Sequence, residues 1–151
     1  TSLWTLTFNS DFAIGYTGLM GNPRAIGEAF NITGDEAMSW NQIHKTIADA
    51  LGVELHTCHV SSEFLAAAGE RYGYGFEGSL LGDKTDCAVF DNTKLKRVVP
   101  NMQTNIGIHQ GIRLALDYAF SHPEECQTED PEFDAWCDRV IEVLDKAKSN
   151  V

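Results

Sequence analysis

The sequence predicts an α/β protein in which short strands alternate with helices and the C-terminal part is helical. Two patterns predict this class. β-Branched and aromatic residues gather in short runs early in the chain, whereas apolar residues recur every three or four positions later on. The length of 151 residues fits a single domain over residues 1–151, and a hydrophobic share of 43% is typical of a globular protein.

The opening segment predicts a strand followed by a helix. Leu3–Phe8 is rich in residues that favour strands. Ser10-Asp11 then offers an N-cap for a short helix, which Gly21 and Pro23 end. Ala29–Thr33 is a short apolar run that predicts a second strand.

The next helix has the clearest boundaries in the first half of the chain. Ser39 and Gln42 form the S-x-x-Q pattern of a capping box, and Gly52 stands where a helix-ending glycine belongs. Val53–Val60 predicts a third strand. Five side chains from this half of the chain are expected in the core: Phe8, Phe12, Phe30, Trp40 and Ile47.

Helices and one loop make up the predicted second half. Ser61 or Ser62 caps a helix through Phe64–Ala68, and the aromatic, glycine-rich run Tyr72–Gly82 predicts a mobile loop. A short extended stretch is expected at Cys87–Phe90.

Two longer helices close the prediction. Asn92 or Thr93 first opens one helical turn, which Pro100 ends. Asp130 and Pro131 mark the start of an amphipathic last helix. A helix predicted between Pro100 and Asp130 has an apolar face made of Ile108, Ile112, Ala115, Leu116 and Ala119.

The charge balance disfavours two classes of partner. Eleven basic and twenty-two acidic residues give a net charge of −11, and such a field repels nucleic acid and anionic lipid. The acidity gathers between Glu124 and Asp145, as on a solvated helix face. No apolar run approaches the ~20 residues that a membrane span needs. We therefore expect neither nucleic acid nor a membrane as a partner.

The cysteines and the start of the chain bear on its location. The four cysteines form no C-x-x-C pair, which indicates free thiols in a reducing compartment, and no signal peptide is visible. A cytoplasmic protein is expected. Because the chain opens on Thr1 and a strand is predicted from Leu3, we also expect it to be a piece of a longer protein.

No complete catalytic, cofactor-binding or metal site is predicted from the residues alone. Gly15–Gly21 and Gly73–Gly78 match glycine patterns of dinucleotide sites, but neither is expected to lie between a strand and a helix as such sites require. All four tyrosines lack the lysine of a Tyr-x-x-x-Lys pair. His56 and Cys58 would share one face of a strand, without a second ligand pair at zinc spacing.

Four stretches follow one another in a familiar order. They are Thr7–Ala13 with Asp-hydrophobic-Ala, Phe30–Gly34 ahead of Ser39-Trp40, Gly82-Asp83 ahead of Phe90–Leu95, and Gly111–Tyr118. In residue pattern and spacing they resemble the C-terminal half of an extended short-chain dehydrogenase/reductase of the NAD-dependent epimerase/dehydratase family. The resemblance covers residues 1 to about 120.

The resemblance implies an enzyme of two parts. An N-terminal Rossmann domain would hold NAD or NADP and the catalytic Tyr-x-x-x-Lys, and a C-terminal lobe would close over a small-molecule substrate, with a sugar nucleotide as one candidate. Residues 1–151 would be that lobe, lacking the Rossmann domain and inactive alone. The family grips its diphosphate with two arginines, but Trp4 and Leu80 stand at those positions here. Ligand contacts are therefore expected from Trp4, Asp83 and Lys84.

An alternative hypothesis is a non-catalytic binding or interaction module derived from the same fold. The two hypotheses differ in whether a Rossmann half precedes Thr1 in the gene. A lobe without its partner domain would expose apolar surface, so we also expect a homodimer or poor solubility.

Overall fold

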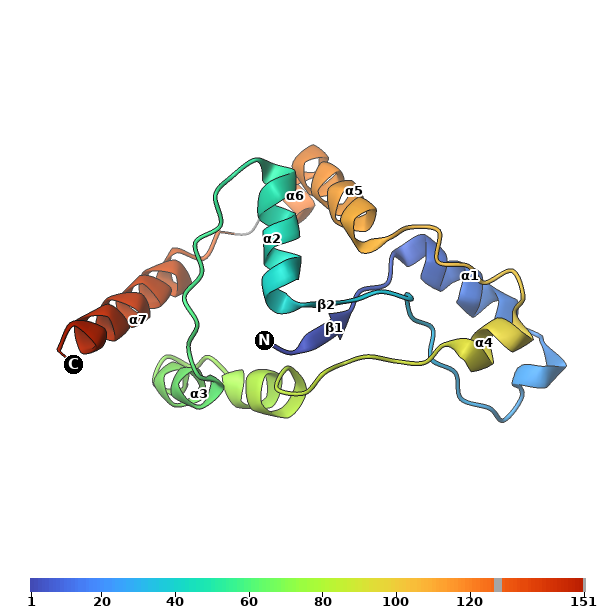
Figure 1. The fold of residues 1–151 in the computed structure, drawn as a ribbon, viewed down its shortest axis with the longest axis horizontal. Coiled ribbons are helices and arrows are strands. Elements are labelled where there is room, and N and C mark those ends of the chain that lie inside the picture. Colours follow the sequence, from blue (N-terminus) through green and yellow to red (C-terminus); the bar gives the residue numbers. More distant parts are fainter. Residues whose placement is uncertain (127–128, 151) are drawn as a thin grey trace.

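The chain folds into three groups of helices arranged around a very small sheet, as the computed structural model shows (Figure 1). The structure describes residues 1–126 and 129–150. The fold is mixed α/β and mostly helical, which confirms the predicted class at a coarse level. Its elements are β1 (Leu3–Thr5), α1 (Asn9–Leu19), the 3-10 turn η1 (Pro23–Ala25), β2 (Ala37–Ser39), α2 (Trp40–Leu51), α3 (Ser62–Glu70), the π-helical turn η2 (Glu77–Asp83), α4 (Thr93–Val98), α5 (Ile108–Ser121), α6 (Pro123–Cys126) and α7 (Pro131–Ser149).

The sheet brings the N-terminus together with residues far along the chain. β1 and β2 pair antiparallel, with Trp4 opposite Met38. On the other side of β1, Ala88 forms a single parallel bridge with Trp4, and the Ala88 amide donates to the Leu3 carbonyl at 2.8 Å. The side chain of Thr5 adds a 2.8 Å hydrogen bond to the Ala88 carbonyl. β1 is therefore the centre of this sheet, and residues 84–88 lie beside it.

The strand predictions are partly wrong. The first strand ends at Thr5 rather than Phe8, and Ala29–Thr33 joins no sheet. The end of that second segment is held by side chains instead, because the Gly34 amide donates to Thr7 Oγ1 and Asn92 Nδ2 donates to the Thr33 carbonyl. Val53–Val60 is a coil between α2 and α3 that pairs with no strand (Figure 1). A β-rich run becomes a strand only where another strand offers its hydrogen-bonding edge.

Local capping signals located most helix starts correctly. The Ser39 hydroxyl and the Gln42 side chain make both hydrogen bonds of the capping box, and Gly52 ends α2 with φ 70°. Ser61 caps α3, and the Asp130 side chain accepts from the Phe133 amide at the start of α7. These contacts satisfy backbone groups that a helix end would otherwise leave unpaired.

Two local predictions are corrected. α1 begins at Asn9, so Asp11 lies in its first turn and is 2% exposed rather than serving as the cap. Its Oδ2 accepts from the Ile106 amide at 3.0 Å, which ties α1 to the segment ahead of α5. The predicted loop Tyr72–Gly82 is also wrong in its second half, because Glu77–Asp83 winds into η2.

The three helix groups are α1 with α4, α2 with α5, and α3 and η2 with α7, and each has its own apolar centre. Leu95, Val99 and Met102 are buried between α1 and α4, and α2 packs on α5 through buried side chains such as Ile43 and Ile112. The third centre is an aromatic cluster that joins the 72–76 segment to α7, made of Tyr72, Tyr74, Phe76, Phe133 and Trp136.

The predicted core residues are less buried than expected. Phe12 is 45% exposed, which contradicts its assignment to the core. Phe8, Phe30, Trp40 and Ile47 are half-buried. The buried face of α1 is instead the side that carries Gly15, so Phe12 and Tyr16 stack on each other on the outside.

Packing explains the glycine pattern at residues 15–21. A Cβ on Gly15 would stand 2.7 Å from Ile32 Cγ2, and a Cβ on Gly18 would collide with the Val99 side chain. Gly21 ends the helix with φ 70°, in the left-handed region. Gly15 and Gly18 therefore allow close approach of α1 to α4 and its neighbours.

Replacing Gly18 with alanine is expected to lower the free energy of unfolding by about 1–3 kcal/mol, because the added methyl overpacks the contact with Val99. Urea denaturation followed by circular dichroism measures the change. Gly78→Ala is the matched control, since a Cβ there meets nothing within 4 Å. Equal stability of the two variants would contradict the close approach.

Candidate functional site

The three residues predicted to contact a ligand lie together in the structure. Lys84 Nζ lies 5.7 Å from the centroid of the Trp4 ring and 3.4 Å from Asp83 Oδ2. Trp4 belongs to β1, whereas Asp83 ends η2 and Lys84 follows it. The Ser2 hydroxyl donates a hydrogen bond to the Lys84 carbonyl at 2.7 Å, which holds the backbone at Lys84 beside the N-terminal strand. That these residues contact a ligand remains a prediction.

A cavity of about 520 Å³ opens beside this trio. It lies between the N-terminal strand, the first turns of α2 and α3, and the end of η2. Its size falls within the range of about 300–1,000 Å³ typical of small-molecule sites. The lining residues are Thr1, Ser2, Trp40, His44, Ser62, Leu80, Lys84 and Thr85.

Aromatic rings form one wall of the cavity. The ring centroids of Trp40 and His44 are 6.0 Å apart, and Trp4 stands behind them with its centroid 5.5 Å from that of Trp40. Trp4 is therefore a support for the wall and for Lys84, rather than a lining residue. The wall offers flat apolar surface with a polar imidazole at one side.

Two residues of this wall, Trp40 and His44, were not among the predicted ligand contacts. Trp40 was expected in the core, and His44 was not singled out. The signal was present, because the capping box fixes the start of α2 and residues four apart lie on the same helix face. What the pattern could not reveal is that this face meets Leu80 and Lys84, some 40 residues further along the chain.

The cavity contains one lysine side chain, that of Lys84, which is about half-exposed. The side chain of Lys84 is 39% exposed and that of its partner Asp83 is 59% exposed, so water screens their attraction. Among the lining residues, all of which the structure describes, Lys84 is the one lysine or arginine. Chemically the arrangement can hold a flat ring against Trp40 and His44 and an anionic group at Lys84.

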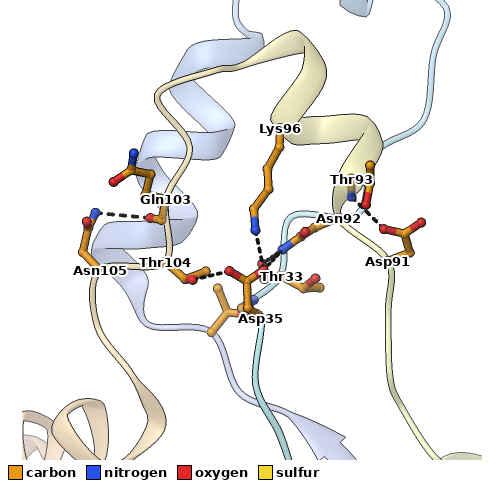
Figure 2. A network of polar contacts seen from close by, with 11 residues as sticks. Thr33, Asp35, Asp91, Asn92, Thr93, Lys96, Gln103, Thr104 and Asn105 are labelled. Carbon is orange, nitrogen blue, oxygen red and sulfur yellow. Dashed lines mark hydrogen bonds and ion pairs between the residues drawn. The ribbon is translucent and has the colours of Figure 1, made fainter.

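A second polar cluster surrounds Asp35, as Figure 2 shows. Lys96 Nζ and Thr104 Oγ1 each lie 2.5 Å from its carboxylate oxygens, and Asn92 Nδ2 donates to it at 2.8 Å. These hydrogen bonds, that of Lys96 first, lower the pKa of Asp35 from 3.8 to about 2. The cluster joins α4, the segment after Thr33 and the segment before α5, so it serves packing between elements.

The low pKa of Asp35 predicts a loss of stability in acid. A carboxylate with a pKa of about 2 in the folded state and 3.8 when unfolded stabilises the fold fully above pH 3.8. That contribution disappears as the pH falls towards 2. Because the side chain is 42% exposed, we expect only about 1 kcal/mol after solvent screening. Urea midpoints between pH 5 and 2 should fall less for Asp35→Asn than for the wild type, and parallel curves would contradict this.

Neither glycine pattern fits a dinucleotide phosphate. Gly15 and Gly18 lie inside α1 against Ile32 and Val99, which fill the space that a phosphate would need. Gly73–Gly78 leads into η2 and follows α3 rather than a strand. His56 and Cys58 lie on the exposed coil, and among the described residues no three His, Cys, Asp or Glu side chains gather as a metal site.

Comparison with known proteins adds no relative, because no family model, curated protein or solved structure matches the chain. Within residues 1–126 and 129–150, none of the helices combines the length and the apolar content needed to cross a membrane.

Proposed function

We propose that the chain is the C-terminal substrate-binding lobe of an NAD(P)-dependent epimerase, dehydratase or reductase. One observation supports this most strongly. In the family that the sequence resembles, arginines that bind the substrate stand at the positions that Trp4 and Leu80 occupy here. In this chain Leu80 lines the cavity, and Trp4 lies against both Trp40 and Lys84, which also line it. Of two positions 76 residues apart, one therefore lines the cavity and the other lies directly behind its wall, which agrees with a substrate site in this region.

The surface of α1 agrees with a lobe that packs on another domain. Phe12 and Tyr16 stack on each other on the outside of α1, Met20 follows as its C-cap residue, and the three are 45%, 53% and 65% exposed. Exposed apolar side chains that gather in this way often mark a surface that another protein or domain covers. A neighbouring domain of the same enzyme would cover it.

In this proposal the chain binds and orients the substrate. Trp40 and His44 hold its flat part, Lys84 attracts an anionic group, and the apolar wall excludes water from that side of the substrate. NAD or NADP, bound mainly by residues outside 1–151, supplies hydride transfer. The lobe contributes no catalytic residue.

The gene upstream of Thr1 tests the proposal. We expect it to encode a strand, a glycine pattern and a helix, followed by Tyr-x-x-x-Lys, and we expect the full-length protein to bind NADH or NADPH in a fluorescence titration. A start codon close to Thr1 and no dinucleotide binding would overturn the enzyme and favour a non-catalytic binding module.

Lys84→Ala in the full-length enzyme is expected to raise KM for the substrate about tenfold with kcat little changed, because uniform binding is lost. Steady-state kinetics measures both constants. Lys146→Ala is the matched control, since Lys146 is 76% exposed on α7 and does not line the cavity. An unaltered KM would remove Lys84 from the site.

A further inference from the structure

We infer that the cavity takes a flat, ring-containing monoanion, such as an aromatic carboxylate, and not a nucleoside diphosphate. The inference rests on the proposed function, because it takes the cavity to be the substrate site. Its three grounds are the shape of the wall, the one lysine side chain beside it and the absence of a second lysine or arginine side chain among the lining residues, all of which the structure describes.

The wall selects a flat apolar body. Trp40 and His44 stand one helical turn apart, their ring planes differ by 37°, and Leu80 completes the apolar lining. Offset stacking of a ligand ring on an indole stabilises the complex beyond the burial of apolar area alone. A cavity of about 520 Å³ accommodates a bicyclic ring with a short substituent.

The charge selects a single anionic group. Lys84 Nζ is the side-chain ammonium available to it, held between the face of Trp4 and Asp83 Oδ2. Both residues restrict where the ammonium lies, and Asp83 already offsets part of its charge. A carboxylate would take one charge-assisted hydrogen bond from Lys84.

A diphosphate needs more positive charge than this site supplies. Recognition of two linked phosphates typically uses the paired donors of arginine, and the lining residue at position 80 is leucine. The acidic partner Asp83 and the net charge of −11 add repulsion. A dianion or trianion would therefore remain undercompensated beside Lys84.

Isothermal titration calorimetry on the full-length protein tests the ligand class with three probes: 2-naphthoate, the uncharged 2-naphthalenemethanol and UDP-glucose. We expect 2-naphthoate to bind about tenfold more tightly than the alcohol, the size of one charge-assisted contact that is partly screened. UDP-glucose should bind at least tenfold more weakly than 2-naphthoate. UDP-glucose binding more tightly than 2-naphthoate would overturn the inference.

Variants locate the effect at the cavity. Lys84→Met should abolish the difference between 2-naphthoate and the alcohol, whereas Lys84→Arg should retain it. Leu80→Arg should tighten UDP-glucose about tenfold, because it adds a second cation beside the first. Lys146→Met, at a residue that does not line the cavity, should change none of these ratios. A charge preference that survives Lys84→Met would overturn the assigned site.

Titration of the same samples with NADH and NADPH separates the two proposals. Failure to bind either dinucleotide overturns the proposed function. Dinucleotide binding together with a preference for UDP-glucose over 2-naphthoate overturns the ligand class alone.

Discussion

Replacing Trp136 with alanine is expected to lower the free energy of unfolding by about 3–5 kcal/mol, the usual cost of removing a buried tryptophan. Trp136 is 4% exposed and is the hub of the aromatic cluster. Its ring centroid lies 5.2 Å from that of Tyr74, 5.6 Å from that of Phe76 and 5.8 Å from that of Phe133. Because these contacts join α7 to the 72–76 segment, the variant should release α7 from the rest of the fold.

Urea denaturation and limited proteolysis measure the two consequences. Trp136→Ala should shift the urea midpoint downward and expose α7 to cleavage, whereas Trp136→Phe should retain part of the stacking and lose less. Phe120→Ala is the control, since Phe120 is an aromatic residue on α5 that is 61% exposed. Such a surface change is expected to stay within about 0.5 kcal/mol of the wild type. A Trp136→Ala variant as stable as this control would show that the cluster does not hold α7.

Leu95→Ala is expected to cost about 2–5 kcal/mol, because it leaves a void in a packed core. Leu95 is fully buried on α4 and lies in one cluster with Val99 and Met102, against Ile14 and Ile32. The approach of α1 is fixed by Gly15, whose hypothetical Cβ would already stand 3.3 Å from Leu95 Cδ2. The helices therefore have little freedom to collapse into the void.

The same chemical change on α5 provides the control. Leu114 is 40% exposed, so Leu114→Ala should alter the free energy of unfolding by about 0.5 kcal/mol or less. Chemical denaturation of both variants measures the difference, which should be several-fold. Similar costs for Leu95→Ala and Leu114→Ala would contradict the α1–α4 core.

The starts of α2, α3 and α7 could be predicted because the signals that set them are local. Ser39 with Gln42, Ser61, and Asp130 with Pro131 each act within one turn, so the sequence around them is sufficient. Local signals did not suffice to predict the strands. Ala29–Thr33 and Val53–Val60 have strand-like composition, but the fold supplies no edge for either.

The candidate site divides in the same way. Trp4, Asp83 and Lys84 were expected from the order of four short motifs, and the structure brings these three side chains together. The cavity wall of Trp40 and His44 could not be expected, because it depends on how α2 lies against η2 and the N-terminal strand.

The sequence by itself determined the starts and caps of α2, α3 and α7, the excess of acidic residues and the three residues that meet beside the cavity. The tertiary structure decided which extended segments pair, which face of α1 is buried and what lines the cavity. The physical reason is the range of the interactions. Caps and helical periodicity act over about four residues. The bridge of Trp4 to Ala88 and the approach of Gly15 to Leu95 join residues about 80 positions apart, and only the folded chain brings such residues together.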